Sequence, residues 1–358
     1  MRVLVLAHHA RYACRRSGAC CTAGWRIPVE PDRAMAIRRD FGRRQVFEEG
    51  TSILRLAPDG RCILYEPPLA GRPGACLVHR TRGHAALPSA CRHFPRVFLC
   101  DGHATRLTLS HFCPTAASLL FGDDPLRIVD APPLLAPPGD REGLDATTAL
   151  PPLLHPDMLM DAVGYAEWET GAIGAFADAC TPEDALARID ASVERLRRWR
   201  PGSKPLLDAV REVWGEVNAE SIQAGPPQGD RAAWLANAAF ESVPESLAVD
   251  ASPLDEQADD RFAAERWPAF SAPIRRYLAG RLFGSWTAYQ GKGLRTVAAS
   301  AACALALLRI HAARACAQAA RPLDAELLTG AVRQTDLLLV HKADAQKLAD
   351  RLSRVERD

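Results

Sequence analysis

Residues 12–21 read YACRRSGACC and begin the stretch, ending at Thr115, that decides the fold of this chain. Eight of the eleven cysteines and seven of the ten histidines lie within the first 121 residues. Thiolate and imidazole are the usual ligands of zinc, and four thiolates are the usual ligands of an iron–sulfur cluster. The stretch therefore predicts a domain that folds around metal.

Two short segments repeat the pattern of a glycine, any residue and a cysteine, followed by apolar residues. They read GRCILY at 60–65 and GACLVH at 74–79. Glycine before a ligand allows the backbone to bend so that amide hydrogens point at the sulfur. The two segments therefore look like a pair of metal-binding turns.

The dipeptide Asp101-Gly102 lies between two strand-like segments, which predicts a two-residue hairpin. A regular ladder around this turn would bring Cys91 and Cys113 together at its open end. Cys100 would then lie at the turn, roughly 30 Å away at about 3.3 Å per residue.

Seven cysteines are predicted to bind metal, because clustering of this kind is hard to explain by packing alone. They are Cys14, Cys20, Cys21, Cys62, Cys76, Cys91 and Cys113. Cys20 and Cys21 are adjacent, and adjacent side chains diverge, so they would ligate different metals or leave one thiolate free. The other four cysteines are expected to be small apolar residues, namely Cys100, Cys180, Cys303 and Cys316.

Several histidines could replace a thiolate, although each alone is better explained as a surface residue or as a partner behind a ligand. They are His79, His84, His93, His103 and His111. His93 is the best candidate for such a partner, because it lies two residues after Cys91.

The rest of the chain reads as a proline-rich segment followed by helices. Thr181-Pro182-Glu183-Asp184 is typical of a helix start, and the apolar spacing after it continues to Leu196. The sequence thus predicts an α+β protein with three parts. They are a small metal-stapled strand-and-loop cysteine domain at 1–121, a proline-rich linker or extended surface arm at 122–152, and a mainly α-helical domain at 153–358.

The two halves of the chain carry opposite charge. Residues 1–121 hold 18 arginines, no lysine and 8 acidic residues, whereas residues 122–358 hold 26 basic and 35 acidic residues. We expect the halves to attract each other. The arginines are scattered without a concentrated basic stretch, which argues against a nucleic-acid partner.

No segment reads as an export signal or a membrane span. The first apolar run ends at His8-His9, and the later run at 297–308 is shorter than the roughly 18 residues that a span requires. We therefore expect a cytoplasmic protein that does not associate with a membrane, in a reducing compartment where cysteines bind metal and do not form disulfides.

The combination of these motifs resembles the flagellin lysine-N-methylase family, which belongs with the YkgJ-type cysteine-cluster proteins. The matching segments are Cys14 to Cys21 with the following GWRIP at 24–28, the paired glycine–cysteine turns, CRHFPR at 91–96 and CPTAA at 113–117. The resemblance implies zinc or iron ligands at the seven cysteines. It also implies methyl transfer from S-adenosylmethionine to a lysine of a protein substrate with accessible lysines.

Two other classes of function remain open at this point. One is a non-enzymatic, zinc-stapled interaction module whose arginine-rich face binds an acidic partner. The other is a metal-handling protein that stores or delivers metal, which would explain surplus thiolates without any active site. The chain has neither a P-loop nor a glycine-rich dinucleotide motif.

Overall fold

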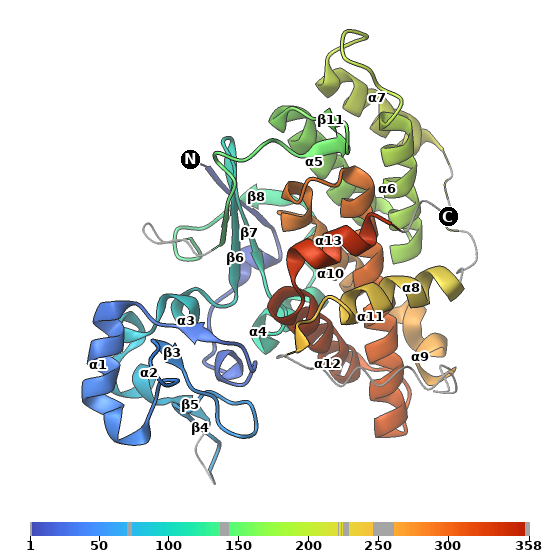
Figure 1. The fold of residues 1–358 in the computed structure, drawn as a ribbon. Helices are drawn as coiled ribbons and strands as arrows, with labels where there is room; N and C mark the ends of the chain where they lie inside the picture. Colours follow the sequence, from blue (N-terminus) through green and yellow to red (C-terminus); the bar gives the residue numbers. More distant parts are fainter. Residues whose placement is uncertain are drawn as a thin grey trace.

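The computed structural model describes residues 2–69, 74–136, 143–220, 222, 224, 229–245 and 261–354. A five-stranded sheet lies beside a group of helices, and a cysteine-rich lobe lies below the lower end of its strands β6 and β7 (Figure 1). We call residues 18–93 the cysteine lobe and residues 162–354 the helical body. The mixture of sheet and helix, with the helices in the C-terminal part, confirms the predicted α+β class.

The sheet has the strand order β8-β1-β7-β6-β9. Its strands are β1 (Arg2–Leu6), β6 (Arg96–Cys100), β7 (Ala104–Leu109), β8 (Ile128–Asp130) and β9 (Gly143–Asp145). Neighbouring strands β1 and β7 are parallel, and the chain between β1 and β6 builds the whole cysteine lobe. Where the chain leaves and returns, the Arg96 guanidinium lies 5.8 Å from the centre of the Tyr12 ring.

Both faces of the sheet are covered, and all six residues of the central strand β7 are buried. On one face, Leu107 packs with Val5 and Phe98 in a core of their own. On the other face, the Thr108 hydroxyl donates a hydrogen bond of 3.1 Å to the carbonyl of Gly280 in the helical body. The sheet is therefore built into the body and is not a separate layer at the surface.

The predicted hairpin is present, but its turn is shifted by one residue. Cys100 pairs with Thr105, so Gly102-His103 forms the turn and Asp101 closes the ladder by donating its N–H to Ala104. The Asp101 carboxylate accepts the N–H groups of His103 and Ala104, which fixes this register.

The strand pairing of the hairpin does not extend as far as Cys91 and Cys113, as a regular ladder would have done. The ladder ends at the pair Arg96 and Leu109. Before it, Cys91 lies on the short helix α3 (Ser89–His93) and packs against the core of the cysteine lobe. Cys113 packs in the core beneath the sheet.

The cysteine lobe contains helices as well as short strands, so the expectation of strands and loops alone was wrong. Its helices are α1 (Pro31–Phe41), α2 (Leu77–Arg82) and α3, and its strands are β2 (Ile27–Pro28), β3 (Ile53–Leu54), β4 (Tyr65–Glu66) and β5 (Ala75–Cys76). Helix α1 begins with proline at its first position and buries Ala34 and Ile37 against the lobe. The lobe has its own small apolar core.

The segment 122–152, which the sequence predicts to be a linker or an extended surface arm, contributes strands to the sheet. It supplies the edge strands β8 and β9 of the sheet, while residues 137–142 lie outside the described residues. The main core also extends across the boundary expected near residue 121, because Leu6, Ala117 and Leu120 pack in the same cluster as the body helices.

The helical body follows the short strands β10 (Leu153–His155) and β11 (Met158–Leu159). Its helices are α5 (Ala162–Asp178), α6 (Pro182–Leu196), α7 (Leu206–Ala219), α8 (Gly229–Phe240), α9 (Arg261–Arg266), α10 (Ser271–Leu282), α11 (Leu294–Ala319), α12 (Ala325–Asp336) and α13 (Ala345–Leu352). Helix α6 starts as predicted, because the Thr181 hydroxyl accepts the N–H of Asp184 at 3.0 Å. Residues 337–342 continue α12 as a π-helical segment.

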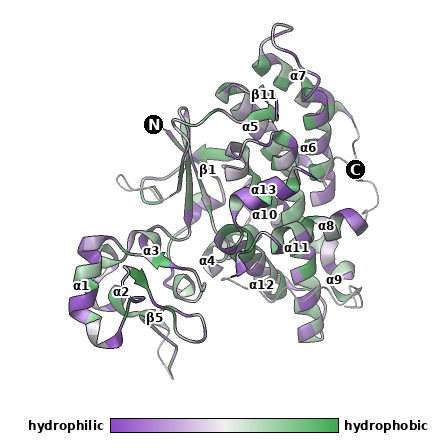
Figure 2. Cartoon of the chain, in the orientation of Figure 1, coloured by the Kyte–Doolittle hydropathy of each residue, from purple (hydrophilic) through white to green (hydrophobic). Residues whose placement is uncertain are grey.

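Helix α11 is long and apolar enough to cross a membrane by length and composition, but it is the central helix of the body. About four fifths (78%) of its most apolar 18-residue window is buried inside the protein. It packs against α6, α8, α10 and α12, and Figure 2 colours the cartoon of these helices by hydropathy. Its apolar surface is therefore used for packing.

Candidate metal centres

Four of the predicted ligands converge inside the cysteine lobe. Cys20 and Cys21 come from a single turn of 3-10 helix, Cys62 precedes β4, and Cys76 ends β5. The Cys21 thiol is hydrogen bonded to the thiols of Cys20 and Cys76, and Cys62 is close enough to both of these for their charges to interact. The Cys62 N–H also donates to the carbonyl of Cys21 at 2.8 Å. Three separate segments thus bring four sulfurs to one place.

Backbone amides point at two of these sulfurs, as predicted for the glycine–cysteine turns. The Cys62 sulfur accepts a hydrogen bond from the N–H of Leu64, and the Cys76 sulfur accepts from the N–H groups of Val78 and His79. Helix α2 begins directly after Cys76, so the N–H groups of its first turn have no partner within the helix. These amides stabilise a thiolate.

The pKa values of the four thiols differ because of hydrogen bonding and burial. The hydrogen bond from Cys21 lowers the pKa of Cys76 to about 7, against the effect of burial and with the help of the two backbone amides. The same thiol lowers the pKa of Cys20, and its own pKa is raised because it donates to both neighbours. Burial raises the pKa of Cys62 to about 11. A bound cation would allow all four to lose their protons.

The other three predicted ligands have different surroundings. Cys91 is half-buried against the same lobe core. Cys14 is exposed and Cys113 is buried, and both are hydrogen bonded to the Tyr12 hydroxyl, which lies 3.9 Å from the Cys113 sulfur. The structure therefore divides the seven cysteines into a group of four, a neighbour, and a pair at Tyr12.

The cysteines that were predicted not to bind metal lie outside the group. Cys100 contacts the Thr105 hydroxyl at 3.5 Å at the closed end of the hairpin. Cys303 and Cys316 are fully buried on α11. Cys180 is exposed and not buried as expected, because it lies in the turn between α5 and α6.

The predicted histidines have different surroundings. His79 and His84 stack edge to face in the lobe, with ring centres 5.8 Å apart. His93 packs against Phe98, and His103 lies in the hairpin turn. His111 alone of the five is fully buried.

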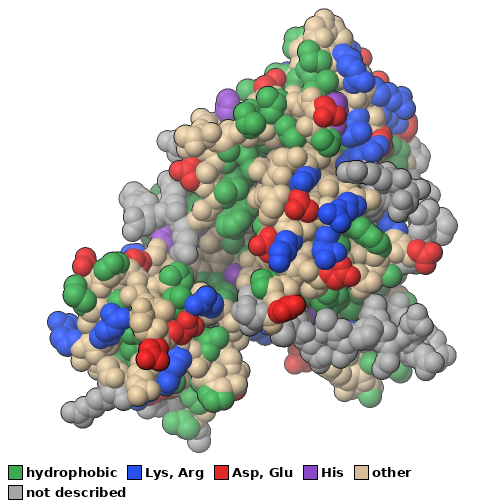
Figure 3. Space-filling view, viewed as in Figure 1, with side chains coloured by type: hydrophobic (Ala, Val, Ile, Leu, Met, Phe, Trp, Pro, Cys, Tyr) green, Lys and Arg blue, Asp and Glu red, His purple; other side chains and the backbone are tan. Residues whose placement is uncertain are grey.

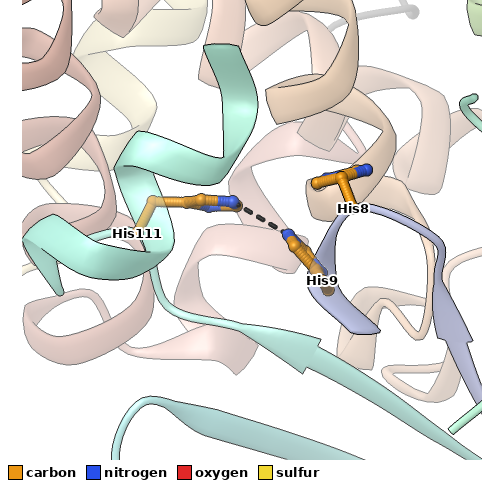
Figure 4. Close-up of side chains that lie close together, drawn as sticks. All are labelled: His8, His9 and His111. Carbon is orange, nitrogen blue, oxygen red and sulfur yellow. Dashed lines mark hydrogen bonds between the residues drawn. The ribbon is translucent and has the colours of Figure 1, made fainter. Parts of the chain in front are cut away.

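His111 belongs to a second cluster that the sequence did not predict, together with His8 and His9. Among the described residues, these three form the group whose potential ligand atoms all lie within 4.8 Å of one another. His8 and His9 come from the turn after β1 and His111 from the turn after β7; His9 and His111 point toward each other, and His8 lies beside His9 (Figure 4). The Nε2 atoms of His9 and His111 are 3.0 Å apart.

All three rings are fully buried, and several ring nitrogens have no hydrogen-bond partner. These are both nitrogens of His8 and Nδ1 of His9. Burial holds the pKa of His8 at about 3, aided by the charges of His111 and Arg276, so the ring is neutral. The only feature of the sequence that could have indicated this cluster is the pair of adjacent histidines, His8 and His9, shortly after the apolar strand β1.

A cavity of about 520 Å³ lies between the cysteine lobe and the helical body, on the face that Figure 3 shows hollowed between them. The lobe contributes Trp25 and Arg26, and the body contributes Arg281 and Trp286. Gly280 also lines the cavity, and a Cβ atom on it would lie 3.2 Å from the Cε1 atoms of His9 and His111. The cavity and the histidine cluster therefore share a wall.

Comparisons with protein-family models, with curated proteins and with solved structures found no match to this chain. What the chain does must therefore be argued from these clusters and the cavity beside them.

Proposed function

We propose that the cysteine lobe folds around a metal centre held by Cys20, Cys21, Cys62 and Cys76. The observation that carries this proposal is the convergence of four thiols from three segments, two of which receive backbone N–H groups at sulfur. Such hydrogen bonds favour the thiolate, which is the form that binds metal. The lobe core is small, so bound metal would supply much of its folding free energy.

Two observations favour an iron–sulfur cluster over a single zinc ion. Cys20 and Cys21 are adjacent, and adjacent side chains diverge. Within the described part of the chain, no three cysteine sulfurs lie within 4.8 Å of one another. Around one tetrahedral zinc, with Zn–S distances of about 2.3 Å, all sulfurs would lie about 3.8 Å apart. A cluster with several irons accommodates a wider spacing.

We further propose that the cavity binds S-adenosylmethionine and that the protein transfers its methyl group to a lysine of a protein substrate, as the resemblance to flagellin lysine-N-methylases implies. The sulfonium of this donor is a cation, and the aromatic rings of Trp25, Phe94 and Trp286 line the cavity where they could face it. Arg26 and Arg281 could pair with its carboxylate.

The cavity also suits the requirements of the reaction. The lysine nitrogen must be neutral, so that its lone pair forms the new N–C bond while the C–S bond of the donor breaks. Both groups must be held in line and shielded from water. A site recessed between the lobe and the body, with part of its wall open to solvent, offers some of this shielding, whereas an interaction module needs no such cavity.

The metal centre is tested by purifying the protein without oxygen and measuring iron, zinc, sulfide and the absorption spectrum. We expect iron and sulfide together, and we expect Cys76→Ser to lose them while Cys303→Ser, a buried control outside the lobe, keeps them. Stoichiometric zinc without sulfide would instead support the zinc-stapled interaction module. Metal content that is equal in both variants would refute the proposed ligands.

The methyl-transfer proposal has a separate test. Radiolabelled S-adenosylmethionine is incubated with the protein and a lysine-rich protein substrate, and its binding is measured by calorimetry. Trp25→Ala should weaken binding of the donor, whereas Trp234→Ala, a partly exposed control on α8, should not. Equal binding by both variants would show that the cavity is not the donor site.

A further inference from the structure

We propose that His8, His9 and His111 bind a divalent transition-metal ion at a second site, distinct from the cysteine centre. The three side chains are 0% exposed and come from two segments that lie about a hundred residues apart in the chain. Their ligand atoms already lie within 4.8 Å of one another, so a small adjustment of the rings would place all three around one ion.

The unpartnered nitrogens are the strongest reason to place a ligand here. Buried polar atoms are nearly always hydrogen bonded, and an exception requires an explanation. The contact between His9 and His111 accounts for one nitrogen of each ring. It leaves both nitrogens of His8 and Nδ1 of His9 without any partner, and a metal ion would engage a nitrogen of His8 that packing alone leaves unused.

Asp336 prepares His111 for this role. Its Oδ2 atom lies 3.2 Å from His111 Nδ1 and accepts the His111 backbone N–H at 2.5 Å. Its Oδ1 atom accepts the Tyr277 hydroxyl at 3.0 Å, and Arg281 lies 3.9 Å away. The carboxylate therefore places the proton on Nδ1 and turns the lone pair of Nε2 toward His9 and His8. Metal-binding histidines are commonly oriented in this way.

The donor set indicates the class of ion. Neutral imidazoles suit zinc, copper, nickel, cobalt and ferrous iron, whereas magnesium and calcium prefer oxygen ligands. Three protein ligands leave a coordination position free, which is the pattern of catalytic and not of structural zinc sites. Because Gly280 separates His9 and His111 from the cavity, an ion here would lie directly behind the cavity wall.

The inference does not depend on the proposed function, because it uses none of the cysteines. The test is titration of the full-length protein with Co²⁺ in the absence of oxygen. Imidazole-bound Co²⁺ absorbs in the visible range without the near-ultraviolet charge-transfer band that thiolates add. We expect one Co²⁺ per chain without this band, and we expect the same site in Cys76→Ser, where the cysteine centre is damaged.

Three variants assign the ligands. His9→Gln should weaken Co²⁺ binding at least tenfold, and Asp336→Asn should weaken it about 10–100-fold through the orientation of His111. His311→Gln is the matched control, because His311 is half-buried with a buried, unpartnered Nε2 atom but lies on α11 outside the cluster. Its affinity should not change.

The proposal is overturned if His9→Gln binds Co²⁺ as tightly as the wild type. Should His9→Gln not fold, X-ray absorption of the wild-type Co²⁺ protein decides the question. Imidazole scattering around a cobalt that carries no sulfur supports the site. Its absence from every bound cobalt refutes the site and leaves the three histidines as a packed, hydrogen-bonded cluster.

Discussion

Arg106 in β7 is the residue whose charge we expect to matter most for stability, because it neutralises two buried carboxylates. Its side chain is 2% exposed, donates to Glu169 Oε2 at 2.5 Å and forms an ion pair with Asp101. Asp101 closes the hairpin and Glu169 lies on α5, so Arg106 joins the sheet to the helical body. Arg106→Met keeps much of the side-chain volume and removes the charge.

The magnitude follows from what the variant leaves behind. Glu169 would still accept the N–H of Gly284 at 2.9 Å. Asp101 would still accept two backbone N–H groups in the hairpin turn and the Tyr289 hydroxyl at 3.1 Å. These hydrogen bonds hold both carboxylates in the interior without neutralising them. Removing one partner of a buried ion pair costs about 3–5 kcal/mol. We expect the free energy of unfolding at pH 7 to fall by that amount, out of about 5–15 kcal/mol for a typical protein.

The cost should also depend on pH. Burial raises the pKa of Asp101, but the charge of Arg106 and the backbone N–H groups outweigh this effect and hold it below its usual value. The resulting stability is complete above the unfolded pKa, about 3.9, and is lost as the pH falls through the lower folded pKa. The difference between the wild type and Arg106→Met should therefore shrink below about pH 4.

The assay is urea unfolding followed by far-ultraviolet circular dichroism at pH 7 and again at pH 3.5. Arg295→Met is the matched control, because it removes a two-point ion pair with Glu194 at the surface of the helical body. A surface pair contributes about 0–1 kcal/mol. A cost for Arg106→Met no greater than that of the control would refute the argument from burial.

Three further predictions concern the lobe and the body. Cys62→Ser should lower both the metal content and the melting temperature of the lobe, whereas Cys303→Ala should lower the free energy of unfolding by about 1–2 kcal/mol and keep the metal. Metal analysis and calorimetry test this, and loss of metal from both variants would contradict it. Thr181→Ala removes the cap of α6 and should lower the unfolding free energy by about 1 kcal/mol, and an unchanged melting curve would speak against the cap. Gly171→Ala would place a Cβ 2.2 Å from Trp214 Nε1, so we expect the free energy of unfolding to fall by about 1–3 kcal/mol and the tryptophan fluorescence to change. A variant as stable as the wild type would show that α5 and α7 can move apart to make room for the methyl group.

The sequence predicted features that depend on neighbouring residues. Thr181 and Pro182 mark the start of α6 because a cap and a first-turn proline act within a few positions. The amide groups at Cys62 and Cys76 followed from the local turn in the same way. The hairpin was also recognisable, but its register depends on how the Asp101 side chain bonds the backbone, and the pattern of residue types does not contain this information.

Features that depend on distant residues were not predicted. His8 and His9 form a cluster only together with His111, whose ring is oriented by Asp336. Asp336 lies 225 positions after His111 and is brought to it by the packing of α12. The helix α1 was missed for another reason. Its apolar positions are few and its arginines many, so its pattern is weak until the lobe covers Ala34 and Ile37.

The close approach of Tyr12 and Arg96 has a consequence for how this protein can be altered. The cysteine lobe is an insertion whose two ends meet at the sheet, so a few glycines could span the gap if the lobe were excised. Strands β1, β6 and β7 would keep their partners, and the shortened protein should still fold around α11. The lobe could then be replaced by another module, provided that this module covers Phe112 and Leu337, which pack against Ala19, Ala23 and Trp25 of the lobe.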